Sequence, residues 1–217
     1  KPCPLQSYCH SPVFNGDLIM IRSLSRWFGL ALLLAGLIGC SAMTAQNPSG
    51  DWRPVNAVPA EQGEALMLKG ADVVAYFTQN QHLQGSPAIR SSHQGVTFHF
   101  ANADHKALFD KAPSKYLPQY GGFCANGIAY GIPWGGDADT WKMINGKLYI
   151  FGGAASRDAW LLDEATNLQH AQRYWTEEVS GNNSFWQRTK RLVFRVPHYQ
   201  SGEQLAKAVA EAKAKRP

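Results

Sequence analysis

Cysteine is scarce in this chain of 217 residues, which holds four of them. Three lie in the first 40 residues, at Cys3, Cys9 and Cys40, and only Cys124 follows. A closed structural zinc site takes four ligands, usually Cys and His, at ordered spacings. Because no such spacing surrounds Cys124, the sequence argues against a structural zinc module.

Other signatures are missing as well. The chain shows no internal repeat, no phosphate-binding loop, no nucleophile motif and no carboxylate pair. Its apolar run from Trp27 to Ile38 is shorter than the ~20 residues that cross a bilayer as a helix. The sequence therefore offers no motif of a common enzyme class and no transmembrane helix.

A basic face for nucleic acid is also missing from the body of the chain. The net charge is +5, but residues 186–217 hold eight Lys/Arg against two Asp/Glu. Residues 50–185 hold ten against thirteen and are slightly acidic. The basic character belongs to the tail, so we expect no nucleic-acid partner.

The segment 20–39 has the pattern of a secretion signal. Arg22 and Arg26 precede the apolar run 27–38, and small residues end it at Gly39 and Cys40. Leu37-Ile38-Gly39-Cys40 resembles the lipobox of bacterial lipoproteins. That resemblance implies cleavage before Cys40, a lipid on its thiol, and a place in the cell envelope facing the periplasm. An uncleaved apolar anchor, or cleavage after Ala42 or Ala45, is the alternative.

Ser41, the residue after the lipidated cysteine, is of the kind that favours the outer over the inner membrane. Residues 1–19 are then an upstream extension, and residues 40–63 a polar linker that connects the membrane anchor to a domain at 64–180. Residues 181–217 form a basic connector and a terminal helix, which Ser201 caps together with Gln204.

The sequence predicts an α+β domain, with a small antiparallel sheet of β-hairpins packed by helices. Residues 89–93 and 95–100 predict two strands around a turn at Gln94-Gly95. Val96, Phe98 and Phe100 share one face of the second strand. His99 lies on the opposite face, so we expect it to be exposed.

Helices and a second hairpin follow in the sequence. One helix begins at Asn102 or Asp104 and ends before Pro113, with His105 at its surface, and a short helix follows from Pro113. Asn145-Gly146 between two alternating apolar runs predicts a type I′ hairpin over residues 141–151. Ser156 is predicted to cap one helix that continues to about Glu177.

Four blocks in this order resemble the YHS domain of secreted bacterial proteins. The most specific is Pro113–Ala125, which includes Gly121-Gly122 and Cys124. The other three are Gly70–Phe77, Gly95–Phe100, and Trp141 with Asn145–Tyr149. The resemblance implies a small metal-associated module, in some cases attached to copper or heavy-metal transport. Cysteines that metal-linked members carry near Val73 and at Ala101 are absent here.

Candidate site residues follow from this resemblance and from the residue types. Cys124, His99 and Met143 are the candidate ligands for copper or another soft ion. Asp72, Tyr76 and Tyr120 are candidates for a pocket. Each has a structural alternative, because free cysteine is most often a small buried hydrophobe and an Asp at the start of an element is usually a cap.

Three functions remain open. The first is a non-catalytic, lipid-anchored binding module of the cell envelope that takes a soft metal. The second is a thiol-dependent enzyme that uses Cys124 as nucleophile beside a base. The third is an interaction domain whose exposed aromatics or basic tail dock a membrane or a protein partner, which the sequence does not identify.

Overall fold

The computed structural model describes residues 45–50 and 52–215. The chain divides into two compact units, residues 1–40 and 41–217, and all described residues belong to the second. The predicted upstream extension, signal peptide and lipid-bearing Cys40 lie outside the described residues. Among the described helices, none combines the length and the apolar content needed to cross a bilayer.

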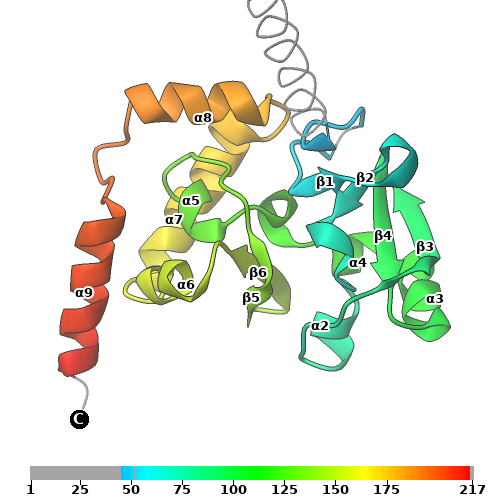
Figure 1. Ribbon diagram of the computed structural model, residues 1–217. Helices are drawn as coiled ribbons and strands as arrows, with labels where there is room; N and C mark the ends of the chain where they lie inside the picture. Colours follow the sequence, from blue (N-terminus) through cyan, green and yellow to red (C-terminus); the bar gives the residue numbers. More distant parts are fainter. Residues whose placement is uncertain (1–44, 51, 216–217) are drawn as a thin grey trace, which may run out of the picture. The chain divides into compact units, whose positions relative to one another are not determined.

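The described chain is an α+β domain built on two small sheets (Figure 1). The first has four strands in the order β1-β2-β4-β3, and the second is the hairpin β5-β6. All pairs are antiparallel except β2 with β4, which pair in parallel through Leu66 and Thr97. The strands are β1 (Ala57–Pro59), β2 (Ala65–Met67), β3 (Ser86–His93), β4 (Val96–Phe100), β5 (Asp137–Ile144) and β6 (Lys147–Phe151).

Short helices connect and cover these sheets. In the first half they are η1 (Glu61–Gly63), η2 (Leu68–Gly70), α2 (Ala75–Thr78), α3 (Ala103–Lys111) and α4 (Pro113–Tyr116). In the second half they are η3 (Gln119–Gly122), α5 (Ala125–Ile128), α6 (Ala154–Trp160), α7 (Glu164–Tyr174), the π-helix η4 (Trp175–Val179), α8 (Ser184–Val193) and α9 (Gly202–Ala214).

Three predictions that depend on local sequence are confirmed. Asn145 and Gly146 both have positive φ, as a type I′ turn requires, and join β5 to β6. The Asn102 side chain accepts a hydrogen bond from the backbone N–H of His105 at the start of α3. Ser201 and Gln204 form the predicted capping box of α9. Each of these features depends on residues within a few positions of one another.

The prediction that His99 is exposed is wrong. His99 and Thr97 each retain only 7% exposure, because β4 is an inner strand and both of its faces are covered. A Cβ on Gly85 would lie 2.6 Å from the His99 Cβ, so the chain before β3 crosses directly over this side chain. Burial lowers the pKa of His99.

Two segment boundaries also differ from the predictions. The polar linker was predicted to reach residue 63, but Val55 and Ala57 are buried and β1 pairs with β2. The predicted single helix from Ser156 is interrupted after α6, since Asp163 leaves helical geometry and caps α7 through the backbone N–H of Thr166. The predicted connector also contains a helix of its own, α8.

Two adjoining cores hold the domain together. Phe98, Phe100 and Phe109 pack as an aromatic cluster between the four-stranded sheet and α3. In the second core, Phe151 meets Trp160 edge-to-face at a centroid distance of 5.7 Å. Burial of such rings is the main source of stability in a domain of this kind. Phe123, which precedes the cysteine, belongs to this second core and is fully buried.

Candidate functional site

Cys124 lies at the start of α5, where three parts of the chain meet. Its N–H donates to the carbonyl of Trp134 at 2.9 Å, and its carbonyl accepts from the N–H of Ile128 at 3.0 Å. It also forms an isolated parallel bridge with Ile150 of β6. The side chain retains 3% exposure. The position of the thiol is therefore fixed by backbone bonds to a loop, a helix and a strand.

Ser156 is the polar neighbour of this thiol. The Cys124 Sγ and Ser156 Oγ lie 3.0 Å apart, within hydrogen-bond distance for either donor. The prediction that Ser156 caps its helix is wrong, because Gly153 holds the N-cap position and Ser156 lies inside α6. The helix thus presents a hydroxyl to the sulfur of a residue 32 positions earlier.

The thiol and the hydroxyl line a cavity of about 630 Å³. One wall comes from α5, α6 and the glycines near the hairpin, and the other comes from α9, which stands alongside α6 (Figure 1). Six of the lining side chains are apolar: Trp134, Ala155, Ala159, Leu205, Ala206 and Val209. The polar groups Asn126, Ser156, Tyr199 and Gln200 also border it.

An ion pair fastens α9 beside the cavity. The Lys213 Nζ and Asp158 Oδ2 lie 2.6 Å apart and connect α9 to α6. The hydrogen bond from Lys213 holds the pKa of the Asp158 carboxyl below its usual range, and Arg157 acts in the same direction. Asp158 and Lys213 both border the cavity. Their ion pair therefore helps to hold α9 in place as one wall of the cavity.

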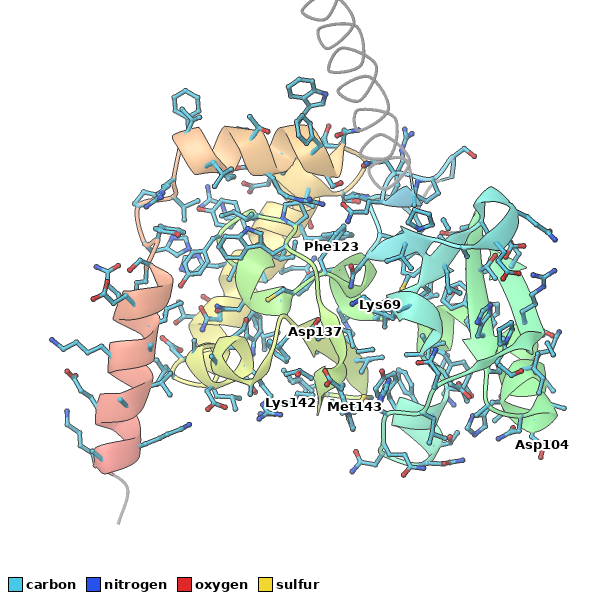
Figure 2. The ribbon with its side chains drawn as sticks, in the orientation of Figure 1. Lys69, Asp104, Phe123, Asp137, Lys142 and Met143 are labelled. Atoms are coloured by element: carbon cyan, nitrogen blue, oxygen red, sulfur yellow. The ribbon has the colours of Figure 1, made fainter. Side chains whose placement is uncertain are left out.

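The predicted metal ligands do not form one cluster. His99 lies in β4 against Gly70 and Gly85, in the four-stranded sheet. Figure 2 shows Met143 far along β5 and well apart from Phe123, the residue before Cys124. Among the described residues, no group of three or more His, Cys, Asp or Glu side chains is placed to hold a metal ion. The other two predicted ligands, His99 and Met143, are not among the residues that line the cavity at Cys124.

Asp72, a predicted pocket residue, is instead fully buried and saturated with hydrogen bonds. Its Oδ1 accepts from the N–H of Val74 at 2.9 Å, as a cap would. Its Oδ2 accepts from the N–H of Ala101 at 2.8 Å and lies 2.6 Å from the His105 Nδ1. His105 was predicted to lie at the surface but is 5% exposed, because it faces this carboxylate. The Asp72–His105 pair links the start of α2 to α3.

The two predicted tyrosines are also largely enclosed. Tyr76 donates its hydroxyl to the carbonyl of Ala138 at 2.6 Å, and burial raises its pKa, with Asp139 and then Asp72 adding to the shift. Tyr120 has positive φ before Gly121 and borders a second, shallower hollow of about 560 Å³ beside α7. Burial raises the pKa of Tyr120 too. Neither hydroxyl is poised to exchange a proton near neutral pH.

The chemistry available at Cys124 is limited by its neighbours. A nucleophilic thiol needs a base or a cationic group nearby to form the thiolate. In the described part of the chain, no imidazole hydrogen-bonds the thiol, whose side-chain partner is the Ser156 hydroxyl. This arrangement suits the recognition of a bound molecule better than attack on one.

Sequence reasoning missed the contribution of α9 to this site. Its lysine-rich composition predicts a solvated face, but Leu205 and Val209 recur at helical spacing and turn to the cavity. That spacing was the available signal. No family model, curated protein or solved structure matches the chain, so the resemblance to YHS domains stays a prediction.

Proposed function

We propose that the protein is a non-catalytic binding module of the cell envelope, tethered through a lipid on Cys40, that holds a small and largely apolar molecule under α9. The observation that supports this is the cavity of about 630 Å³ at Cys124. Ligand sites are typically hollows of ~300–1,000 Å³ with apolar walls and a few polar groups that orient the ligand.

Two of the polar groups that line the cavity lie side by side, while Tyr199, Gln200 and Lys213 line it from the segment that leads into and forms α9. Cys124 and Ser156 lie together where α5 meets α6, while Leu205 and Val209 form the opposite wall on α9. A ligand with an apolar body and one hydrogen-bonding group would place that group against the thiol and hydroxyl. An unpaired polar group in this apolar setting would cost ~1–3 kcal/mol, which gives the site selectivity.

A soft metal is the weaker version of the same proposal. It depends on the resemblance to YHS domains, and one thiol is a poor match for an ion that prefers several soft ligands. A thiol-dependent enzyme is weaker still, because the sulfur has a hydroxyl rather than a base as its neighbour. The binding module is the function that the geometry favours.

The test is protection of Cys124 from alkylation by a bound probe with an apolar ring system and one anionic group, 1-anilinonaphthalene-8-sulfonate. The full chain is treated with iodoacetamide, and modification is read at the peptide that contains Cys124, so the cysteines near the N-terminus do not interfere. We expect the probe to slow alkylation of the wild type. The variant Val209→Trp fills the cavity and should lose this protection.

The matched control is Ala210→Trp, one residue further along α9 at an exposed position outside the cavity lining. This variant should keep the protection. Equal alkylation rates with and without the probe, or protection retained in Val209→Trp, would contradict the proposal. If Cu(I) raises the unfolding temperature of the wild type but not of Cys124→Ser, the soft-metal version is the correct one.

A further inference from the structure

The helix α8 has its polar side turned inward. Ser184 and Gln187 are 1% and 6% exposed, and the Gln187 Nε2 donates to the Gly131 carbonyl at 2.9 Å and to Glu178 at 3.1 Å. Arg191 also pairs with Glu178. A surface helix normally buries its apolar face. Here hydrogen bonds and ion pairs attach the helix to the body.

The outward side of α8 is apolar. Of the eight large hydrophobic side chains that are exposed among the described residues, five lie between positions 185 and 194. At 100° per residue, four of them fall on one face, and the fifth follows the helix end. They are Phe185, Trp186, Leu192, Val193 and Phe194, and the last four are 62–69% exposed. A contiguous apolar patch of this kind marks a contact surface.

The segment that carries this patch has charged side chains of one sign. Residues 184–195 contain four cations and no Asp or Glu. Lys190 flanks the apolar face with a half-exposed side chain that also pairs with Glu178, and Arg195 follows the helix. Aromatic and aliphatic side chains flanked by cations are the composition of helices that lie in the interface of a bilayer with anionic lipids.

The described chain begins against this same helix. The Ser184 N–H donates to the Asn47 side chain at 2.9 Å, and Arg188 donates to the Gln46 side chain. In Figure 1 the first described residues lie beside the start of α8. Gln46 is six residues after Cys40, and a chain of six residue steps spans at most about 20 Å. A lipid on Cys40 would therefore keep α8 close to the membrane.

We infer that α8 is a second membrane contact, lying flat with its apolar face in the boundary between headgroups and acyl chains. The proximity argument rests on the proposed lipid on Cys40, whereas the inverted polarity of α8 does not. Trp186 would sit at the depth that tryptophan prefers in membranes. The ten residues of α8 extend about 15 Å, which suits a helix along the surface.

The test places a photo-reactive residue on this face. The full chain is expressed in a bacterial host with Trp186→p-benzoylphenylalanine or Val193→p-benzoylphenylalanine, and reconstituted in vesicles of phosphatidylethanolamine with a minority of phosphatidylglycerol. Matched controls carry the same residue at Leu108 or Leu162, which are also exposed and apolar. After irradiation, mass spectrometry identifies the adducts. Unfolding temperatures should match the wild type, since all four positions are exposed.

We expect lipid adducts at positions 186 and 193 and only background at 108 and 162. Background at all four positions in a chain that carries a lipid on Cys40 would overturn the inference and leave the proposed anchor intact. Lipid adducts at 186 in a chain without that lipid would support α8 as a membrane contact and defeat the anchor. Adducts to another protein would assign this face to a protein partner and overturn the membrane contact.

Discussion

The carboxylate of Asp72 and the imidazole of His105 lie 2.6 Å apart, although 33 residues separate them in sequence. The His105 Nε2 continues the network to the Thr78 Oγ1 at 3.3 Å and the Gln79 Nε2 at 3.2 Å. Because Asp72 also binds the backbone after β4, this network holds α2, α3 and the four-stranded sheet in one arrangement.

Replacing Asp72 should destabilise the domain strongly. Asp72→Ala leaves the imidazole and the N–H groups of Val74 and Ala101 without their acceptor. Loss of one partner of a buried pair costs ~3–5 kcal/mol. Urea unfolding followed by tryptophan fluorescence measures the change. The control is Asp110→Ala, which removes an exposed pair with Lys106 and should cost less than ~1 kcal/mol. Equal losses of unfolding free energy in the two variants would show that the buried network stabilises the domain no more than an exposed ion pair does.

Gly121 should not tolerate a side chain. It has φ of +61°, and a Cβ there would overlap the carbonyl oxygen of Pro54. The Gly121 carbonyl also accepts from the N–H of Asn56 at 2.8 Å. This hydrogen bond holds the segment around Gly121 against the segment around Pro54, so the two cannot move apart to make room for a Cβ. Gly121→Ala should cost ~1–3 kcal/mol from overpacking, measured as the free energy of unfolding. Gly202→Ala, with open space around it, should be neutral within about 0.5 kcal/mol.

His170, which stacks on His198, should make stability depend on pH. Their rings stack with centroids 3.8 Å apart. Burial lowers the pKa of His170 from 6.5, the charges of His198 and Arg173 lower it further, and Asp163 partly opposes them. The unfolded chain therefore takes up this proton more readily than the folded chain. The stability contribution is complete above pH 6.5 and declines as the pH falls below that value.

Thermal unfolding at a series of pH values between about 7.5 and 5.5 measures this decline. His170→Gln should reduce the loss, because it removes the group whose pKa folding lowers. His82→Gln is a suitable control, since His82 lies elsewhere, near Tyr76. An unchanged pH profile in His170→Gln would show that the stacked pair does not govern the acid sensitivity.

Lys213 should control access to Cys124. Lys213→Ala removes the 2.6 Å contact with Asp158 that fastens α9 over the cavity. The pair is partly exposed, so the free energy of unfolding should fall by less than ~1 kcal/mol. Peptide-resolved alkylation of Cys124 should nevertheless become faster. Lys207→Ala on the same helix, where the side chain is 80% exposed, should leave the rate unchanged. Equal rates in both variants would mean that α9 does not gate the thiol.

Local chemistry made much of the fold predictable. The hairpin at Asn145-Gly146, the Asn102 cap and the capping box at Ser201 each depend on residues that are close in sequence, where propensity and turn geometry act directly. The α+β class follows from the same patterns. The break between α6 and α7 escaped prediction because the apolar spacing continues across it, while Asp163 ends one helix and caps the next.

The site shows what the sequence by itself did not determine. Composition identified Cys124 as the one thiol of the body and placed it beside a glycine pair and aromatic residues. It did not reveal that Ser156 lies at the sulfur, that α9 closes a cavity over both, or that His99 and His105 are buried. These facts depend on which distant elements pack together. The burial of a side chain depends on every element that packs around it. The periodicity of a strand or helix predicts only which side chains share a face of that element.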